Sequence, residues 1–147
     1  MSLKSWSANG WIDRHCASES EITALIETAE HAIQQAEDLK GLSSAWKLKM
    51  AYDAILSCAR AALFRASYRA SRTGDHYREI QSLELTLALK SQAIDRLNTL
   101  RMRRNAATYE SYELIGDEEA ERALTDAKAL LSTARSRFCE GSQACKG

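Results

Sequence analysis

The chain has 147 residues and no proline, with 45% hydrophobic and 27% charged residues. This length and balance fit one globular domain and exclude a disordered chain. Twenty basic residues balance twenty acidic ones, so no overall field draws the protein to nucleic acid or an anionic membrane. No apolar run approaches the ~18 residues of a membrane span, and no apolar signal core opens the chain, which predicts a cytoplasmic protein without a membrane partner.

Residues 1–17 show no helical periodicity. Trp6 and Trp11 flank an Asn9-Gly10 turn signal in this segment. The favoured interpretation is an N-terminal arm whose tryptophans lie against the rest of the protein. An arm that binds a partner is the alternative.

A first helix is predicted to start after Ser18, which stands three residues before Glu21 and so forms a capping box. Apolar residues then recur at helical spacing from Ile22 to Ala36. The helix is expected to end at Gly41, because glycine suits the left-handed cap.

A second helix is predicted from a cap at Ser43 or Ser44 to about Arg72. Its apolar positions alternate four and three residues apart and include several alanines, which allow helices to approach closely. A third helix opens near His76 and breaks near Lys90.

A fourth helix follows this break and carries a basic stretch that ends at Arg104. Gly116 marks the last boundary, and Asp117 is expected to cap a fifth helix. No strand-like alternation is visible along the chain.

The predicted fold class is therefore all-α, an antiparallel four-helix bundle with a fifth helix and no β-sheet. The second and fourth helices should be central, with Ile55, Ala59 and Leu97 buried. The predicted organisation is an N-terminal arm at 1–17, a helical domain at 18–140 and a flexible tail at 141–147.

Polar residues converge on one end of this bundle if the third and fourth helices form a hairpin. His76 lies fourteen residues before Lys90 (76 to 90), and Arg104 lies fourteen residues after it (90 to 104). Each arm is then roughly 21 Å long, so the two residues reach the same level. The residues expected at this end are Tyr68, Arg69, His76, Tyr77, Arg78, Arg104, Asn105 and Tyr109.

These residue types suit nucleic acid. Guanidinium groups bind phosphate with two hydrogen bonds, and tyrosine and arginine faces stack on bases. A histidine such as His76 can transfer a proton near neutral pH. The alternative is structural: the arginines and tyrosines would tie loop ends together through carbonyl groups and through Asp75 or Glu110.

The sequence patterns typical of metal sites, phosphate-binding loops and serine hydrolases are absent. The four cysteines form no CxxC pair and no cysteine–histidine cluster, and the carboxylates show no paired ligand spacing, so we expect no metal site. The chain has no glycine-rich phosphate loop and no GxSxG elbow. No cofactor is expected.

Two segments carry a family resemblance. They are residues 41–83, GLSSAWKLKMAYDAILSCARAALFRASYRASRTGDHYREIQSL, and residues 100–110, LRMRRNAATYE. They resemble the HEPN domains (higher eukaryotes and prokaryotes nucleotide-binding), in particular a bacterial subfamily of small stand-alone proteins. The resemblance covers roughly residues 20–138 and implies a helical domain that binds RNA or a nucleotide.

The family's ribonuclease members carry an arginine, a polar residue, a short spacer and a histidine, which act in a cleft that two subunits share. Arg104 and Asn105 match the first two places, but Tyr109 stands where the histidine is expected. Tyrosine has an ordinary pKa near 10, which makes it a poor general base at neutral pH. The subfamily's Gly-Tyr-Arg sequence corresponds here to Ser67-Tyr68-Arg69, and its paired histidines correspond to Asp75-His76.

The residues and the family resemblance leave three alternative functions for this protein. The favoured one is an RNA- or nucleotide-binding module without ordinary ribonuclease chemistry, with Tyr68, Arg69, Arg78, Arg104, Asn105 and Tyr109 as binding residues. The second is an active metal-independent ribonuclease, in which Arg104 stabilises phosphate charge and His76 is the acid or base. The third is a structural dimerisation or adaptor bundle.

The resemblance also implies partners. Related domains pair as homodimers, and a nucleotidyltransferase encoded nearby is a partner in related systems. The setting implied is that of toxin–antitoxin or defence-like systems.

Overall fold

The computed structural model describes residues 1–39, 41, 43–109 and 115–140, and it describes the side chains of these residues except 106–109 and 140. The predicted tail, 141–147, therefore lies outside the described residues. None of the helices within the described ranges combines the length and apolar character that crossing a bilayer requires.

The first two long helices begin at the serine caps that the sequence predicts. Helix α2 (Glu19–Asp38) follows Ser18, whose hydroxyl accepts a 3.1 Å hydrogen bond from the backbone N–H of Glu21. Helix α3 (Ser44–Arg65) follows Ser43, which accepts a 3.2 Å bond from the backbone N–H of Trp46. Each cap satisfies one of the N–H groups that a helix start leaves without an intrahelical partner.

Helix α3 ends seven residues before the predicted position at Arg72 (65 against 72). Ser67 has a left-handed φ of 72°, and strand β2 (Tyr68–Ala70) follows. This strand pairs antiparallel with strand β1 (Ile12–Arg14), so the expectation of no β-sheet is corrected by one small sheet. The physical reason is tertiary: the partner strand comes from a segment more than fifty residues away, which local periodicity cannot reveal.

The N-terminal segment folds onto this sheet. Helix α1 (Leu3–Ala8) precedes β1, and a buried cluster joins Trp6 and Ile12 to Leu63 and Tyr68. The tryptophans lie against the domain, as the favoured interpretation of the arm expects, and the arm shares a small buried cluster with α3 and β2.

The predicted third helix is divided into two short ones, α4 (His76–Gln81) and α5 (Leu83–Thr86). Ala88 then has a left-handed φ of 56°, which ends the helical path before α6 (Ser91–Tyr109). The break near Lys90 is confirmed, but the continuous helical arm assumed for the hairpin is wrong.

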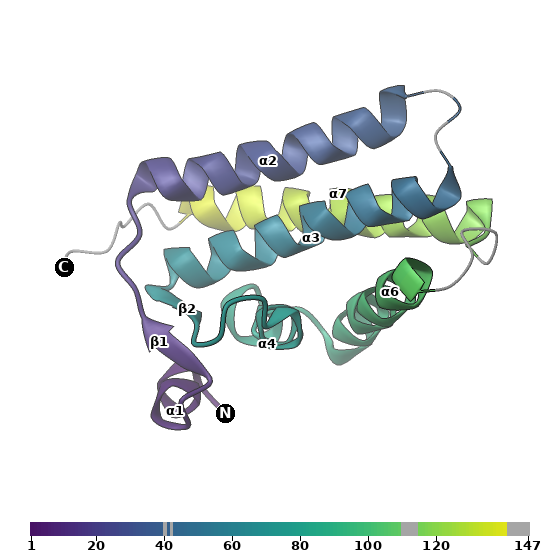
Figure 1. The fold of residues 1–147 in the computed structure, drawn as a ribbon. Helices are drawn as coiled ribbons and strands as arrows, with labels where there is room; N and C mark the ends of the chain where they lie inside the picture. The colour runs from purple at the N-terminus through teal and green to yellow at the C-terminus, as the bar shows by residue number, and fades with distance from the viewer. Residues whose placement is uncertain (40, 42, 110–114, 141–147) are drawn as a thin grey trace.

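Helix α7 (Asp117–Glu140) completes the fold, which is confirmed as all-α apart from the two short strands. Helices α2, α3 and α7 lie side by side, while α4 and α6 lie on another side of α3, with α6 crossing it obliquely (Figure 1). Ile55 and Ala59 are 0% exposed and Leu97 is 4% exposed, so all three predicted core positions are confirmed. The central position of α3 brings the N-terminal arm, α4 and α6 together around one helix.

Candidate nucleic-acid interface

Four side chains alternate cation and ring along one surface, and we call them the arginine–aromatic stack: Trp11, Arg78, Tyr77 and Arg101. The guanidinium carbon of Arg78 lies 3.8 Å from the centre of the Trp11 ring and 5.7 Å from that of Tyr77. The guanidinium carbon of Arg101 lies 5.5 Å from the same Tyr77 ring. The stack thus joins the N-terminal arm, α4 and α6.

Local structure sets the positions in the stack. The β1–β2 pairing fixes Trp11, because its carbonyl accepts a 3.2 Å hydrogen bond from the N–H of Ser71 beside the sheet. Asp75 caps α4 by accepting a 3.1 Å bond from the backbone N–H of Arg78, which orients the first turn of that helix. The Trp6 ring packs edge to face against the Trp11 ring, with 5.6 Å between the ring centres.

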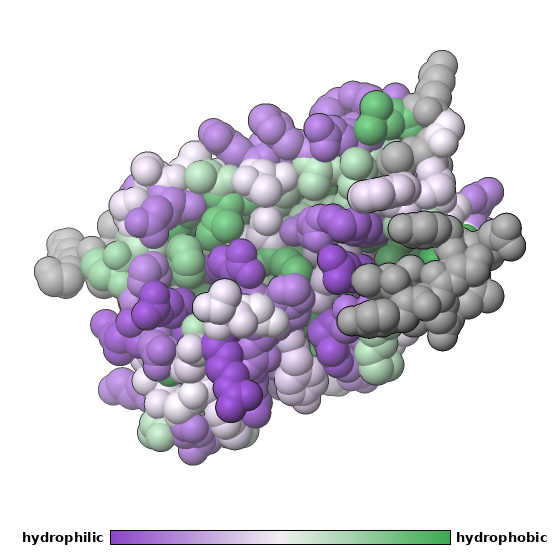
Figure 2. Space-filling view, in the orientation of Figure 1, coloured by the Kyte–Doolittle hydropathy of each residue, from purple (hydrophilic) through white to green (hydrophobic). Residues whose placement is uncertain are grey.

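The stack has one accessible ring. Tyr77 is 43% exposed although two arginine side chains lie within 6 Å of its ring centre, at 5.7 and 5.5 Å. An exposed aromatic ring flanked by guanidinium groups can receive a nucleic-acid base on its face and a phosphate on its flanks. Hydrophilic side chains cover much of the surface over β1, β2 and α4 in the space-filling view (Figure 2).

His76 and Arg104, the two catalytic residues of the ribonuclease alternative, are both half-buried, and both lie near Tyr52. The His76 ring lies 6.0 Å from that of Tyr52, edge to face. Arg104 on α6 acts on Tyr52 electrostatically, as does Arg101. Tyr52 therefore links the start of α4 to the basic end of α6, a role that the sequence did not reveal because Tyr52 reads as an ordinary apolar position.

The Tyr52 hydroxyl is held neutral. Burial raises the pKa of Tyr52 to about 12, and the charges of Arg101 and Arg104 oppose that rise. Among the described residues, none forms a hydrogen bond with this hydroxyl. The phenol is therefore an uncharged group beside His76 at neutral pH.

The other predicted site residues fall in two places. Asn105 is exposed on α6 next to Arg104, and the side chain of Tyr109 lies outside the described residues. Tyr68 is buried under Arg14, whose guanidinium carbon is 5.1 Å from its ring, and Arg69 is exposed on the same strand. These two lie past the end of α3, and the thirteen residues from Tyr52 to Arg65 (52 to 65) span about 20 Å of that helix.

A bidentate ion pair fixes the basic end of α6 against α7. Arg103 donates to Glu119 from Nε at 2.6 Å and from Nη2 at 3.1 Å. The hydrogen bonds from Arg103 lower the pKa of Glu119, and burial opposes this shift. A carboxylate with a lowered pKa stabilises the fold above its unfolded pKa, and this contribution is lost as the pH falls through the folded pKa.

We therefore expect Glu119→Gln to lower the free energy of unfolding at pH 7 by about 1 kcal/mol. The gap between wild type and variant should close as the pH falls below about 4, where the wild-type carboxylate also becomes neutral. Urea unfolding across pH measures both effects. Glu118→Gln is the matched control, because this neighbour is exposed and lies in the same helical turn; an equal loss in both variants would contradict the pair's role.

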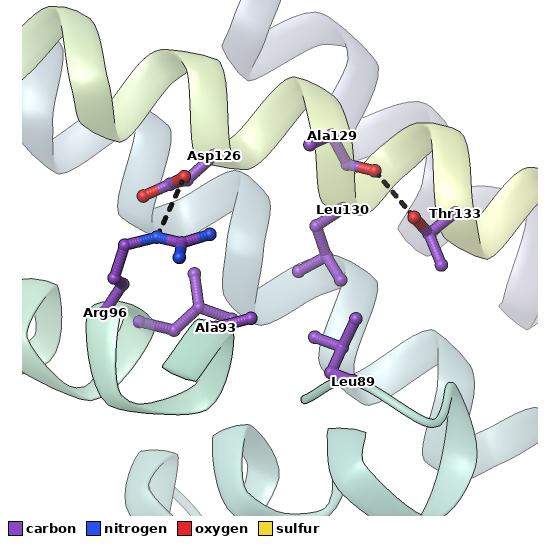
Figure 3. A pocket seen from close by; sticks show the side chains of 8 residues that line it. Leu89, Ala93, Arg96, Asp126, Ala129, Leu130 and Thr133 are labelled. Carbon is purple, nitrogen blue, oxygen red and sulfur yellow. Dashed lines mark hydrogen bonds and ion pairs between the residues drawn. The ribbon is translucent and has the colours of Figure 1, made fainter. Parts of the chain in front are cut away.

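A different pocket, of about 150 Å³, lies between α6 and α7 (Figure 3). It is lined largely by apolar side chains such as Leu89 and Leu130, and its cation Arg96 lies 3.6 Å from Asp126. The neutralised cation and the apolar lining make this pocket unsuited to phosphate. It does provide Arg96 as a comparison for the arginines nearer the end of α6.

Across the described part of the chain, no group of three or more histidine, cysteine or carboxylate side chains could hold a metal ion. The model of the HEPN domain matches residues 22–137 of this chain. The protein belongs to the HEPN domain family, whose members are nucleotide-binding and ribonuclease-like modules that often dimerise and bind RNA. No curated protein matches the chain.

Proposed function

We propose that this HEPN protein binds single-stranded RNA on the arginine–aromatic stack. The observation that carries the proposal is the position of Tyr77, a 43% exposed ring whose centre lies 5.7 Å and 5.5 Å from the guanidinium carbons of Arg78 and Arg101. A base stacked on Tyr77 has phosphates within reach of guanidinium groups, and single-stranded nucleic acid is the ligand whose bases are free to stack. Family membership supports the same ligand.

Arg104 and Asn105 extend the proposed surface along α6. Arg104 would neutralise a phosphate, while exposed Asn105 would add hydrogen bonds. We propose binding rather than cleavage, because Tyr109 occupies the place of the motif histidine and a phenol is a poor general base at neutral pH. His76 is then a neighbour of the bound strand.

A homodimer belongs to the same proposal, because two copies would place two such surfaces in one cleft, and twofold pairing is the commonest closed symmetry. A nucleotidyltransferase is the protein partner that the family resemblance suggests. Neither partner is required for the stack itself, which one chain forms.

The test is fluorescence anisotropy of a labelled single-stranded RNA at low salt, with purified protein and no added metal. We expect Tyr77→Ala to weaken binding about tenfold, since a stacked base contributes about 1–3 kcal/mol. Arg104→Ala should weaken binding several-fold and reduce the slope of log affinity against log salt by about 0.7, the value for one single-strand phosphate contact. Sedimentation of the same samples measures the dimer.

Arg96→Ala is the matched control, because Arg96 lies on the same helix, is 62% exposed and pairs with Asp126. It should leave affinity almost unchanged. Equal losses of RNA affinity in Arg96→Ala and Arg104→Ala would mean that the protein binds RNA only through its general positive charge. Wild-type protein that binds no RNA at low salt would refute the proposal. RNA cleavage that is lost in both His76→Ala and Arg104→Ala would replace binding by the ribonuclease alternative.

A further inference from the structure

A polar pocket, separate from the stack, lies between the end of β2, the loop before α4 and the last turns of α3. It has a volume of about 230 Å³, and its charged lining is Arg60, Arg69, Arg72 and Glu79, with His15 at its edge. Helix α4 contributes to both sites, because Tyr77 and Arg78 belong to the stack while Glu79 lines the pocket. We call it the β2–α4 pocket.

One arginine of the β2–α4 pocket is oriented by a buried acid. Arg60 donates to Glu79 from Nε at 2.7 Å and from Nη2 at 3.2 Å, and the Glu79 residue is only 3% exposed. Hydrogen bonding to Glu79 raises the pKa of Arg60, so its charge is permanent. Two of the five guanidinium N–H groups serve Glu79, which leaves Nη1 with donors for another acceptor.

The other two arginines form no ion pair with a carboxylate in the described part of the chain. Both of them, Arg69 and Arg72, are exposed. Asp13 stands opposite Arg69 in the sheet, but its carboxylate accepts a 2.9 Å hydrogen bond from Ser71. Among the residues that line the pocket, three arginines less one glutamate give two net positive charges (3 − 1 = 2).

The pocket also has an aromatic side. The rings of Phe64 and His15 meet at 4.7 Å beside the arginines. Gly74 lines the pocket in the loop before α4, has a φ of +79°, and has nothing within 4 Å of the place where a Cβ would stand. An apolar ring surface next to cations fits a sugar or base that carries a phosphate.

We propose that the β2–α4 pocket binds a phosphate monoester dianion, as a nucleoside monophosphate or a phosphorylated RNA end carries it. The monoester carries close to two negative charges at neutral pH, which match the two net positive charges, whereas an internal phosphodiester carries one. Arginines from α3, β2 and the loop line one volume, and guanidinium groups can bind phosphate oxygens with two hydrogen bonds each. The stack would hold the strand, and this pocket would recognise a terminal phosphate.

The test measures binding of uridine 5′-monophosphate, uridine, the diester dinucleotide UpU and inorganic phosphate to the full chain by calorimetry. The monophosphate should bind at least tenfold more tightly than uridine or UpU. Arg69→Ala/Arg72→Ala should remove that preference, and Arg72→Ala alone should weaken it. Both arginines are exposed, so the variants should keep the wild-type melting temperature, and Arg96→Ala should bind as the wild type does.

Equal binding of uridine or UpU and the monophosphate would overturn the proposal, as would an unchanged affinity in the Arg69→Ala/Arg72→Ala variant. Inorganic phosphate that binds as tightly as the monophosphate supports the anion site and assigns no role to the nucleoside. Tyr77→Ala should leave monophosphate binding intact. A failure of the proposed phosphate pocket can therefore be distinguished from a failure of RNA binding on the stack.

Discussion

Replacement of Arg60 by alanine is expected to lower the free energy of unfolding by about 3 kcal/mol or more. The Glu79 side chain is 4% exposed and receives both of its described ion-pair hydrogen bonds from Arg60. Without the guanidinium, a negative charge remains in a poorly solvated site, and that uncompensated charge is the source of the cost. Urea unfolding at pH 7 measures it.

Two further variants separate charge from packing at this site. Arg60→Ala/Glu79→Gln should be more stable than Arg60→Ala, because glutamine keeps the volume of Glu79 and removes its charge. Arg135→Ala is the control, since Arg135 and its partner Glu30 are 46% and 49% exposed and such pairs contribute about 0–1 kcal/mol. If Arg60→Ala lowers the free energy of unfolding no more than Arg135→Ala does, the buried charge of Glu79 does not need Arg60 to compensate it.

The second large effect is expected at Ile12, in the N-terminal arm. Ile12 is 0% exposed and packs with Trp6, Leu63 and Tyr68 in a cluster separate from the main core. Ile12→Ala should therefore cost about 2–5 kcal/mol, the range for truncating a fully buried isoleucine, and Ile12→Val about 1 kcal/mol. The measurement is the urea midpoint at constant slope.

The control for Ile12 is Leu39→Ala, because Leu39 is 51% exposed and should change stability by less than about 0.5 kcal/mol. Ile12→Ala with the stability of Leu39→Ala would mean that the arm does not contribute to folding in solution. The expected loss would instead establish that the arm unfolds with the helical domain. It would also tie the position of Trp11 in the stack to the stability of the sheet.

Most of the helical framework could be predicted from local sequence signals. Ser18 and Ser43 are polar caps followed by apolar residues at helical spacing, and a capped start is a local property of a few adjacent residues. The burial of Ile55, Ala59 and Leu97 follows from periodicity in the same way. The absence of proline permits long helices, and four helices of 19 to 24 residues are present.

The end of α3 could not be predicted in this way. The residues after Arg65 include no glycine or proline before Gly74, so periodicity continues the helix through them. The structure ends it because Tyr68–Ala70 pair with a strand from the arm. Such long-range pairing overrides a weak local preference.

The candidate sites, too, were determined partly by local sequence and partly by tertiary structure. The sequence alone determined an all-α domain, the resemblance to HEPN domains and a set of arginines and tyrosines around the loop before His76. Only the tertiary structure decided which of them meet: Arg78 on Trp11, Arg60 on Glu79, and Arg69 beside Arg72 in one pocket. The physical reason is that capping and amphipathic spacing act between near neighbours, whereas a binding site depends on contacts between segments that the pairing of β1 with β2 brings together.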